Sequence, residues 1–442
     1  MPRKRQAKEK TNAEDEASKN TGQTPTGSLP VQTFDEYQCS GNVEADFPGL
    51  CALLDMKNIP TVCTKHPTSS AAKTEGEDGE DNQSKTSTAP FWWKPCLKVE
   101  LESEDPLGPK NMKISGWKVN KQIFRVLQKM LPSVSQLQSL QFWQAGLTDQ
   151  MLISLVNTIS LCSALKVVKL EGSVLPEQSY HLLLSEDSLL THLSLRNNRI
   201  GDEGARLIGS ALSTSRSANK NLMSLNLAFN SIGDAGATHI AKGLRLNRAL
   251  LFLSLSSNQI GDSGAAHLAA ILGKFALTHE EVVERRKLLL QRAQAEASKK
   301  EEKSAANKEK SSKKTSEAKT PRGKGGEPGG RERQSSAHEA ELVEAVNPLL
   351  DKSVHHRDGE VFLPGNTILH SLNLAGNRIT EKSLPLFLAS LETQAEGRGG
   401  LWRLCLQRNL FPPECECYTK IKELMDCSAQ KDRKEEGQEA SH

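Results

Sequence analysis

The chain has 442 residues, of which 36% are hydrophobic, 25% charged and only 4% aromatic. So polar a chain cannot bury a compact core along its whole length, and we expect an ordered part flanked by disordered segments. The net charge of +3 is mild, so bulk electrostatics give no argument for specific nucleic-acid binding. No apolar run approaches the roughly eighteen residues of a membrane span, and we expect no membrane partner.

Cysteine usage bears on the compartment. Nine cysteines are scattered along the chain without the dense spacing of a secreted disulfide scaffold. We therefore expect reduced thiols in a cytosolic or nuclear compartment. The basic N-terminus has no apolar stretch behind it, which argues against secretory and mitochondrial signals.

The N-terminal part alternates between polar and apolar stretches. Residues 1–33 form a basic tail and residues 64–90 a polar linker, and we expect both to be disordered. Between them, residues 34–63 carry apolar side chains at helical spacing, which predicts one short docking helix. Residues 91–136 are interpreted as an N-terminal cap, in which Leu97, Val99 and Leu101 alternate as in a strand.

One unit of sequence is written three times between Leu190 and Leu272. Its pattern is Leu-x-x-Leu-x-Leu-x-x-Asn-x-Ile-Gly-Asp-x-Gly-Ala, which predicts a short strand leading into a helix. Weaker copies bring the number of repeats to seven, and Met112 and Ile114 indicate an eighth, degenerate one. The repeats begin at Leu137, Leu165, Leu190, Leu222, Leu250, Leu369 and Leu401. Because neither half of a unit can bury its apolar face alone, the units must stack into a continuous core.

A long insertion separates repeats 1–5, in residues 137–274, from repeats 6–7 and a C-terminal cap in residues 369–428. Apolar residues mixed with charges predict that the fifth helix either lengthens or is followed at once by another. The remaining boundaries are an extended helix over 275–297, a disordered basic insert over 298–338, a re-entry segment over 339–368 and a disordered tail over 429–442.

Several motifs suggest enzymes, and the repeat explains the best of them. Gly261-Asp262-Ser263-Gly264 resembles a protease nucleophile segment, yet in the sibling repeats the serine slot is variable, which favours a helix-capping aspartate. His356-Arg357-Asp358 lacks the other kinase motifs. Cys405, Cys415, Cys417 and Cys427 lack the spacing of a zinc site. We expect no enzyme, no metal and no cofactor, and we assign the repeated asparagines at 198, 230, 258, 377 and 409 to stability.

The side chains between the repeated leucines must point away from the core, because strand side chains alternate. Large or charged groups lie toward the N-terminal repeats, and small polar residues follow. Tryptophan and arginine on such a surface are typical interface anchors, although merely solvated strand positions would give a similar list. The predicted partner-binding residues are Trp143, Lys169, Glu171, His192, Arg196, Asn226, Phe252, Asn373 and Arg403.

By these motifs the chain resembles the ribonuclease-inhibitor-like leucine-rich-repeat family. The resemblance implies an α/β solenoid with a curved parallel sheet on its concave face and helices on its convex face, acting by protein binding without chemistry. It suggests a cytoplasmic scaffold whose partner is a protein, with the cilium or axoneme as a home and axonemal or cytoskeletal proteins as candidate partners, and no small-molecule substrate. The alternative is a regulator of a small GTPase or NTPase switch through the same face.

Overall fold

The computed structural model describes residues 33–66, 95–103, 105–213, 220–312, 347–351, 354–395 and 400–439. The chain divides into two compact units, residues 1–38 and residues 39–442, and the elements below belong to the second. The predicted N-terminal tail lies outside the described residues apart from Thr33. Most of the predicted linker lies outside them too, but Thr64 and Lys65 were wrongly assigned to it, because they end a strand.

Ten strands form one sheet in the order β1-β2-β3-β4-β5-β6-β7-β8-β12-β13. Every neighbouring pair is parallel except β2 and β3, so β1 and β2 run opposite to the other eight strands. The strands are β1 (Thr61–Lys65), β2 (Cys96–Leu101), β3 (Pro109–Ser115), β4 (Ser139–Trp143), β5 (Val167–Glu171), β6 (His192–Ser194), β7 (Ser224–Asn226), β8 (Phe252–Ser254), β12 (Ser371–Asn373) and β13 (Arg403–Cys405).

The repeated leucines align as adjacent positions of this sheet. Leu193 pairs with Leu225, which pairs with Leu253, and the line continues across the insertion to Leu372 and Leu404. All five are buried. The pairing of β8 with β12 shows that the insertion leaves the stack of repeats uninterrupted, and it confirms the predicted solenoid.

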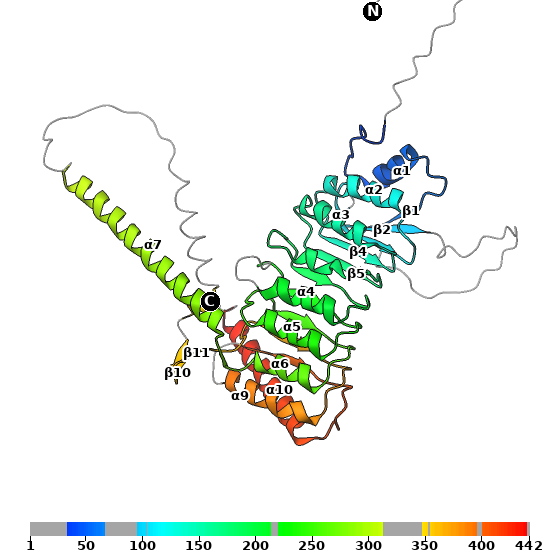
Figure 1. The fold of residues 1–442 in the computed structure, drawn as a ribbon. Helices are drawn as coiled ribbons and strands as arrows, with labels where there is room; N and C mark the ends of the chain where they lie inside the picture. The colour runs from blue at the N-terminus through cyan, green and yellow to red at the C-terminus, as the bar shows by residue number, and fades with distance from the viewer. Residues whose placement is uncertain are drawn as a thin grey trace, which may run out of the picture. The chain divides into compact units, whose positions relative to one another are not determined.

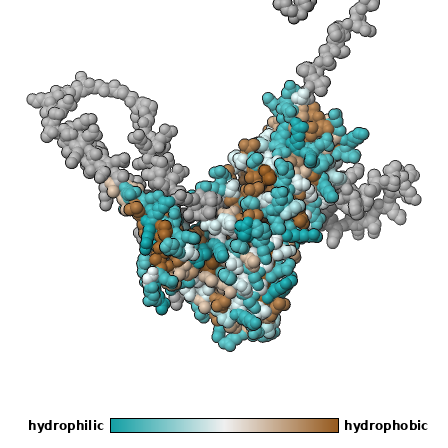
Figure 2. Space-filling model, viewed as in Figure 1, coloured by the Kyte–Doolittle hydropathy of each residue, from teal (hydrophilic) through white to brown (hydrophobic). Residues whose placement is uncertain are grey.

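The helices of the repeats lie on one face of the sheet (Figure 1). They are α2 (Lys121–Met130), α3 (Asp149–Ser160), α4 (Asp202–Ser213), α5 (Asp234–Leu244), α6 (Asp262–Ala270), α9 (Leu384–Ala395) and α10 (Glu416–Glu439), with short 3-10 helices η3 (Leu131–Ser133), η4 (Ser179–Leu184) and η6 (Glu381–Ser383). Their outward surface is a mosaic of hydrophilic and small hydrophobic areas (Figure 2). The opposite face of the sheet, free of helices, is called the concave face below.

In the predicted N-terminal cap, Leu97, Val99 and Leu101 lie in strand β2 as expected. Met112 pairs with Leu140 and Ile114 with Phe142, so β3 and α2 form the degenerate eighth repeat. The predicted docking helix is α1 (Val43–Leu53), which buries Phe47 and packs on α2. Strand β1 was not predicted, and it extends the sheet by pairing with β2.

The repeated asparagines hold each turn to the next. Asn230 donates from Nδ2 to the carbonyl oxygens of Leu195 (3.0 Å) and Leu227 (2.9 Å), and its Oδ1 accepts from the backbone N–H groups of Asn198 (2.9 Å) and Ile200 (3.0 Å). The same pattern recurs at Asn198, Asn258, Asn377 and Asn409. Buried backbone groups need such partners, so the prediction that these amides serve stability is confirmed.

The aspartate of each repeat caps the helix of the following repeat. Asp234 Oδ1 accepts from the backbone N–H groups of Gly261 (2.7 Å) and Gly264 (2.8 Å), at the start of α6. Equivalent contacts to the next repeat are made by Asp149, Gln178, Asp202 and Asp262. The sequence motif correctly predicted a helix cap, but a single repeat could not show that the capped helix belongs to its neighbour.

The insertion begins with β9 (Phe275–Ala276) and α7 (His279–Ser312), so the fifth helix is followed by a separate one. In a second sheet β11 (Glu360–Leu363) pairs with β9 on one side and with β10 (His355–Arg357) on the other, and η5 (Pro348–Leu350) packs on α7. Phe275, Leu277, Leu349 and Leu363 form its core. In the predicted re-entry segment over 339–368, the chain is ordered at 361–363, which lie in β11, whereas residues 339–346 lie outside the described part of the chain.

Two helices extend past the predicted boundaries of disorder. Helix α7 continues to Ser312, well into the predicted disordered insert, and α10 continues to Glu439, into the predicted tail. Both segments are rich in Glu, Lys and, in α7, Ala, which are strong helix formers at spacings that place opposite charges on one face. The polar composition of these segments is therefore compatible with an exposed helix as well as with a disordered coil. Residues 313–338 lie outside the described part of the chain.

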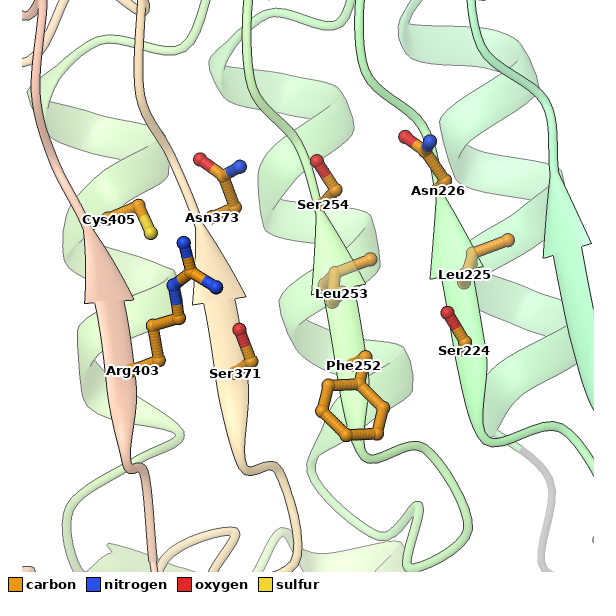
Figure 3. A pocket seen from close by; sticks show the side chains of 10 residues that line it. All are labelled: Ser224, Leu225, Asn226, Phe252, Leu253, Ser254, Ser371, Asn373, Arg403 and Cys405. Atoms are coloured by element: carbon orange, nitrogen blue, oxygen red, sulfur yellow. The ribbon is translucent and has the colours of Figure 1, made fainter. Parts of the chain in front are cut away.

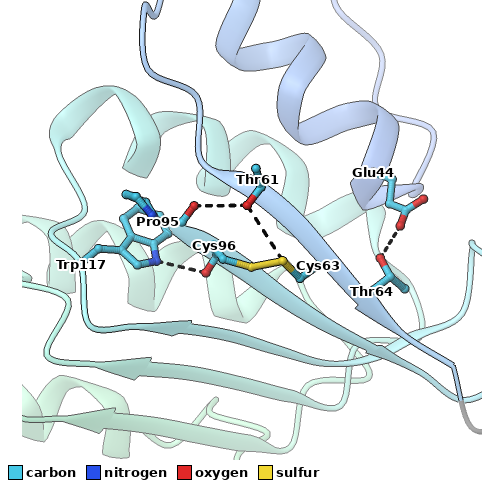
Figure 4. Close-up of a disulfide and its surroundings, with 7 residues drawn as sticks. All are labelled: Glu44, Thr61, Cys63, Thr64, Pro95, Cys96 and Trp117. Carbon is cyan, nitrogen blue, oxygen red and sulfur yellow. Dashed lines mark hydrogen bonds between the residues drawn. A yellow bond between two sulfur atoms is a disulfide. The ribbon is translucent and has the colours of Figure 1, made fainter. Parts of the chain in front are cut away.

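The expectation of reduced thiols is wrong for one pair. Cys63 of β1 and Cys96 of β2 are joined by a disulfide, with their Cα atoms 6.4 Å apart (Figure 4). Trp117 donates from Nε1 to the Cys96 carbonyl oxygen at 3.1 Å beside it. The other seven cysteines are free, and burial raises the pKa of two of them, Cys51 and Cys162, to about 11. The disulfide ties the unpredicted edge strand to the cap. No helix among the described residues is long and apolar enough to cross a membrane.

Candidate functional site

The concave face consists of side chains in three rows that cross the strands. Strand pairing aligns the middle row from Lys113 through Lys169 to Asn226 and Asn373. A second row joins the first residues of the strands, among them His192, Phe252 and Arg403, and a third joins Trp143 to Glu171. All nine predicted residues lie on this face, because each alternates with a buried leucine or its equivalent.

The predicted residues do not form one cluster. Trp143 is 41% exposed on β4, and its neighbour Glu171 accepts a hydrogen bond from Ser194 Oγ at 2.6 Å. His192 contacts Thr191 Oγ1 through Nδ1 at 2.8 Å. Arg403 lies at the opposite end of the sheet, on the last strand. The face therefore offers an N-terminal half and a C-terminal half.

The C-terminal half is hollowed where the side chains are small. A hollow of about 250 Å³ is lined by Ser224, Asn226, Phe252, Ser254, Ser371, Asn373, Arg403 and Cys405. Figure 3 shows Phe252 at the start of β8 and the guanidinium of Arg403 reaching over the sheet between β12 and β13. The side-chain oxygens of Asn226 and Asn373 accept from the backbone N–H groups two residues ahead, both at 3.0 Å. Their NH2 groups can donate hydrogen bonds to the carbonyl oxygens of a partner.

Phe229 is a candidate that the sequence pattern missed. Its ring is 49% exposed, lies 4.3 Å from the guanidinium carbon of Arg196 and lines a second hollow with Asn373 and Arg403. Its backbone φ of +58° lies in the left-handed region, and the equivalent turn residue of each other repeat also has a positive φ. The equivalent residues are Gly116, Gln144, Gly172, Asn197, Ser257, Gly376 and Arg408. The sequence could have identified Phe229 as a candidate because an aromatic residue stands at a turn position where the other repeats carry glycine or a polar residue.

The N-terminal half was underestimated because the predicted face began at β4. A hollow of about 480 Å³ is lined by residues of β1, β2, β3 and β4, among them Lys65, Lys98, Lys113 and Gln141. Lys98 pairs with Lys113, which pairs with Gln141, and that residue pairs with Lys169. Three strands, β2, β3 and β5, thus bring Lys98, Lys113 and Lys169 to one row, and no repeat motif pointed to the first two.

The enzyme-like motifs form no constellation among the residues that the structure describes. Ser263 is exposed on α6, and the nearest imidazole, His267, contacts the backbone oxygen of Ser263 at 2.8 Å. Arg357 and Asp358 form an exposed ion pair in the β10–β11 hairpin. The described part of the chain holds no group of three His, Cys, Asp or Glu residues placed to bind a metal.

The comparison with sequence families agrees with this architecture. The sequence model of the family described as "Leucine Rich repeat" matches residues 187–209, 218–241, 246–269 and 365–384. Among solved structures, the chain is similar to an internalin from Listeria monocytogenes str. 4b F2365, with 12% identity over 70% of this chain and 85% of that chain and a TM-score of 0.25. The matched segments coincide with the repeats whose leucines pair across the sheet. The chain therefore contains leucine-rich repeats and folds as an α/β leucine-rich-repeat solenoid.

Proposed function

We propose that the chain is a non-catalytic scaffold that binds a protein partner on its concave face. The observation that carries this proposal is the placement of three large aromatic side chains there. Trp143, Phe252 and Phe229 are 41%, 42% and 49% exposed, on a face otherwise lined by polar and small residues. Aromatic side chains held on a rigid sheet are typical interface anchors, while the small floor lets a partner's backbone approach closely.

The test compares partner capture by the full chain and by variants. Phe252→Ala, and Trp143→Ala combined with Arg196→Glu, remove anchors from the two halves of the face. Leu161→Ala is the matched control, because Leu161 is 68% exposed at the end of α3, away from the concave face. The proposal expects partners to be lost from the concave variants and kept by the control. Retention of every wild-type partner by both concave variants would show that the face is not the binding surface.

We further propose that the repeats are of the ribonuclease-inhibitor-like type and that the protein is located in the cilium or axoneme. The support is resemblance: residues 36–41, 176–181 and 356–359 look like the corresponding parts of leucine-rich repeat-containing protein 71 of vertebrates, and similar non-enzymatic repeat proteins are axonemal components. A structural axonemal protein should resist detergent extraction together with the microtubules. Complete release into the detergent fraction would argue for a cytoplasmic protein.

The alternative function, regulation of a small GTPase or NTPase switch, uses the same face and the same family resemblance. It predicts a change in nucleotide hydrolysis or exchange when the full chain is added to a panel of GTPases. An unchanged rate across the panel removes this alternative, and it leaves the scaffold proposal in place.

A further inference from the structure

We infer that the concave face takes an acidic protein segment, which lies across the first strands along a row of lysines. This inference rests on the proposed function and names the chemistry of the partner. Among the residues that the structure describes, the face carries seven basic side chains against two acidic ones. The basic residues are Lys65, Lys98, Lys113, Lys169, Arg196, Arg403 and Arg408, and the acidic residues are Glu100 and Glu171.

This excess is local, since the whole chain has a net charge of only +3. The capping aspartates Asp149, Asp202, Asp234 and Asp262 lie outside this face, at the first turns of the repeat helices. A surface with one sign of charge attracts a partner of the opposite sign and raises its rate of association.

The lysines of the N-terminal half are not engaged in ion pairs with other described residues of the chain. Within the described part of the chain, Lys65, Lys98 and Lys113 are exposed and Lys169 is half-buried, and none of the four makes an ion pair. The two glutamates of the face are held by neutral donors. Glu100 accepts from Asn111 Nδ2 at 2.9 Å, and Glu171 accepts from Ser194 Oγ. The ammonium groups therefore remain for a ligand's carboxylates.

The register of the strands sets the spacing of the row. Lys98, Lys113 and Lys169 stand on β2, β3 and β5 at paired positions. Neighbouring strands are about 4.8 Å apart, so the row from Lys98 to Lys169 spans roughly 14 Å. An extended peptide advances about 6.6 Å for every second residue. A segment with acidic residues at alternate positions would thus cover the row with about five residues.

Trp143 gives this row an apolar neighbour. It stands on β4, between Lys113 on β3 and Lys169 on β5, one position along the face from Gln141. An apolar side chain on the partner can cover its ring while the flanking carboxylates reach the lysines. One exposed ring suits a protein segment better than a nucleic acid, whose bases stack on successive aromatic groups.

The experiment measures binding of fluorescent peptides to the full chain by anisotropy. The probes are a twelve-residue peptide of alternating Glu and Ser, the same peptide with Lys in place of Glu, and a single-stranded oligo-dT of twelve nucleotides. The test variant is Lys98→Gln/Lys113→Gln/Lys169→Gln. The control is Lys121→Gln/Lys242→Gln/Lys274→Gln, which removes the same charge from exposed positions outside the face. Circular dichroism and melting curves confirm that both variants fold.

We expect the acidic peptide to bind, the basic peptide not to bind, and the test variant to bind the acidic peptide about tenfold more weakly. The control should stay within about twofold, and added salt should weaken binding. Equal affinity in the two variants, or no binding of the acidic peptide to the wild type, overturns the inference. If Phe252→Ala still abolishes partner capture in that case, the proposed function stands and only the partner's chemistry is wrong.

The same experiment distinguishes two other ligands of the lysine row, a nucleic acid and an acidic segment of the chain itself. Oligo-dT binding as tight as the peptide's, and lost in the same variant, would assign the row to nucleic acid and overturn the inference. The chain's own residues 75–81 carry five carboxylates. Acidic-peptide binding that appears only after Glu75→Gln, Glu77→Gln, Asp78→Asn, Glu80→Gln and Asp81→Asn would make that segment the occupant in place of a partner.

Discussion

Replacement of Asn230 by alanine should remove a buried connection between adjacent repeats. Asn230 is buried, and its amide satisfies two carbonyl oxygens and two backbone N–H groups that belong to its own turn and the preceding one. A methyl group replaces none of these bonds. At about 1 kcal/mol of net stability for each hydrogen bond, Asn230→Ala should destabilise the fold by about 4 kcal/mol.

Asn409 provides the matched comparison, because it occupies the same slot in the last repeat. Its amide donates to the carbonyl oxygens of Leu374 and Leu406 and accepts from the N–H of Ile379, but the side chain is only partly buried. Water can replace these bonds when the amide is removed. We therefore expect Asn409→Ala to cost about 1–2 kcal/mol.

Urea unfolding followed by far-ultraviolet circular dichroism measures both free energies. The account predicts a loss for Asn230→Ala at least twice that for Asn409→Ala. A loss below about 1 kcal/mol for Asn230→Ala, or equal losses for the two variants, would refute the argument that buried asparagines couple the repeats.

Four further outcomes follow from the structure. Phe229→Asn should change stability by less than about 1 kcal/mol in unfolding assays, because relief of the left-handed backbone offsets the lost cation–π contact, yet it should weaken partner capture. Gly243→Ala should cost about 2–3 kcal/mol, because the new methyl would lie 2.4 Å from the Gly209 carbonyl oxygen, whereas Gly201→Ala, with open space around it, should cost less than about 0.5 kcal/mol. Partial burial alone would raise the pKa of Asp262, but hydrogen bonds from the next repeat outweigh it and hold that pKa below its usual value; its stabilisation, measured against Asp262→Asn, should be complete above about pH 4 and vanish as the pH falls below that. Thiol titration under denaturing conditions should find seven free cysteines before reduction and nine after it, and nine before reduction would contradict the disulfide.

The periodic part of the fold was predictable from the sequence because the same apolar pattern recurs in each repeat. Leu193, Leu225 and Leu253 occupy one slot in nearly identical units, and each must be buried by its neighbours. The same template found Leu372 across a long insertion, where propensity alone would have failed. Alternation within each strand then placed all nine predicted surface residues on the concave face.

What the sequence concealed depends on contacts between units. Strand β1 has no repeat motif, and its pairing with β2 is a tertiary contact, so Lys65 and Lys98 could not be assigned to the face. The capping aspartates reach the next repeat, which a local motif cannot reveal. Phe229 stands in a turn slot that varies between repeats, and only the coordinates bring its ring to Arg196.

Site-specific photo-crosslinking shows whether a protein partner contacts the concave face. Benzoylphenylalanine placed at position 252 stands on the open sheet, and the same group at position 161 stands among the helices. The account predicts that irradiation joins the captured partner to the chain from position 252 and not from position 161. Crosslinking of that partner from position 161 alone would contradict it.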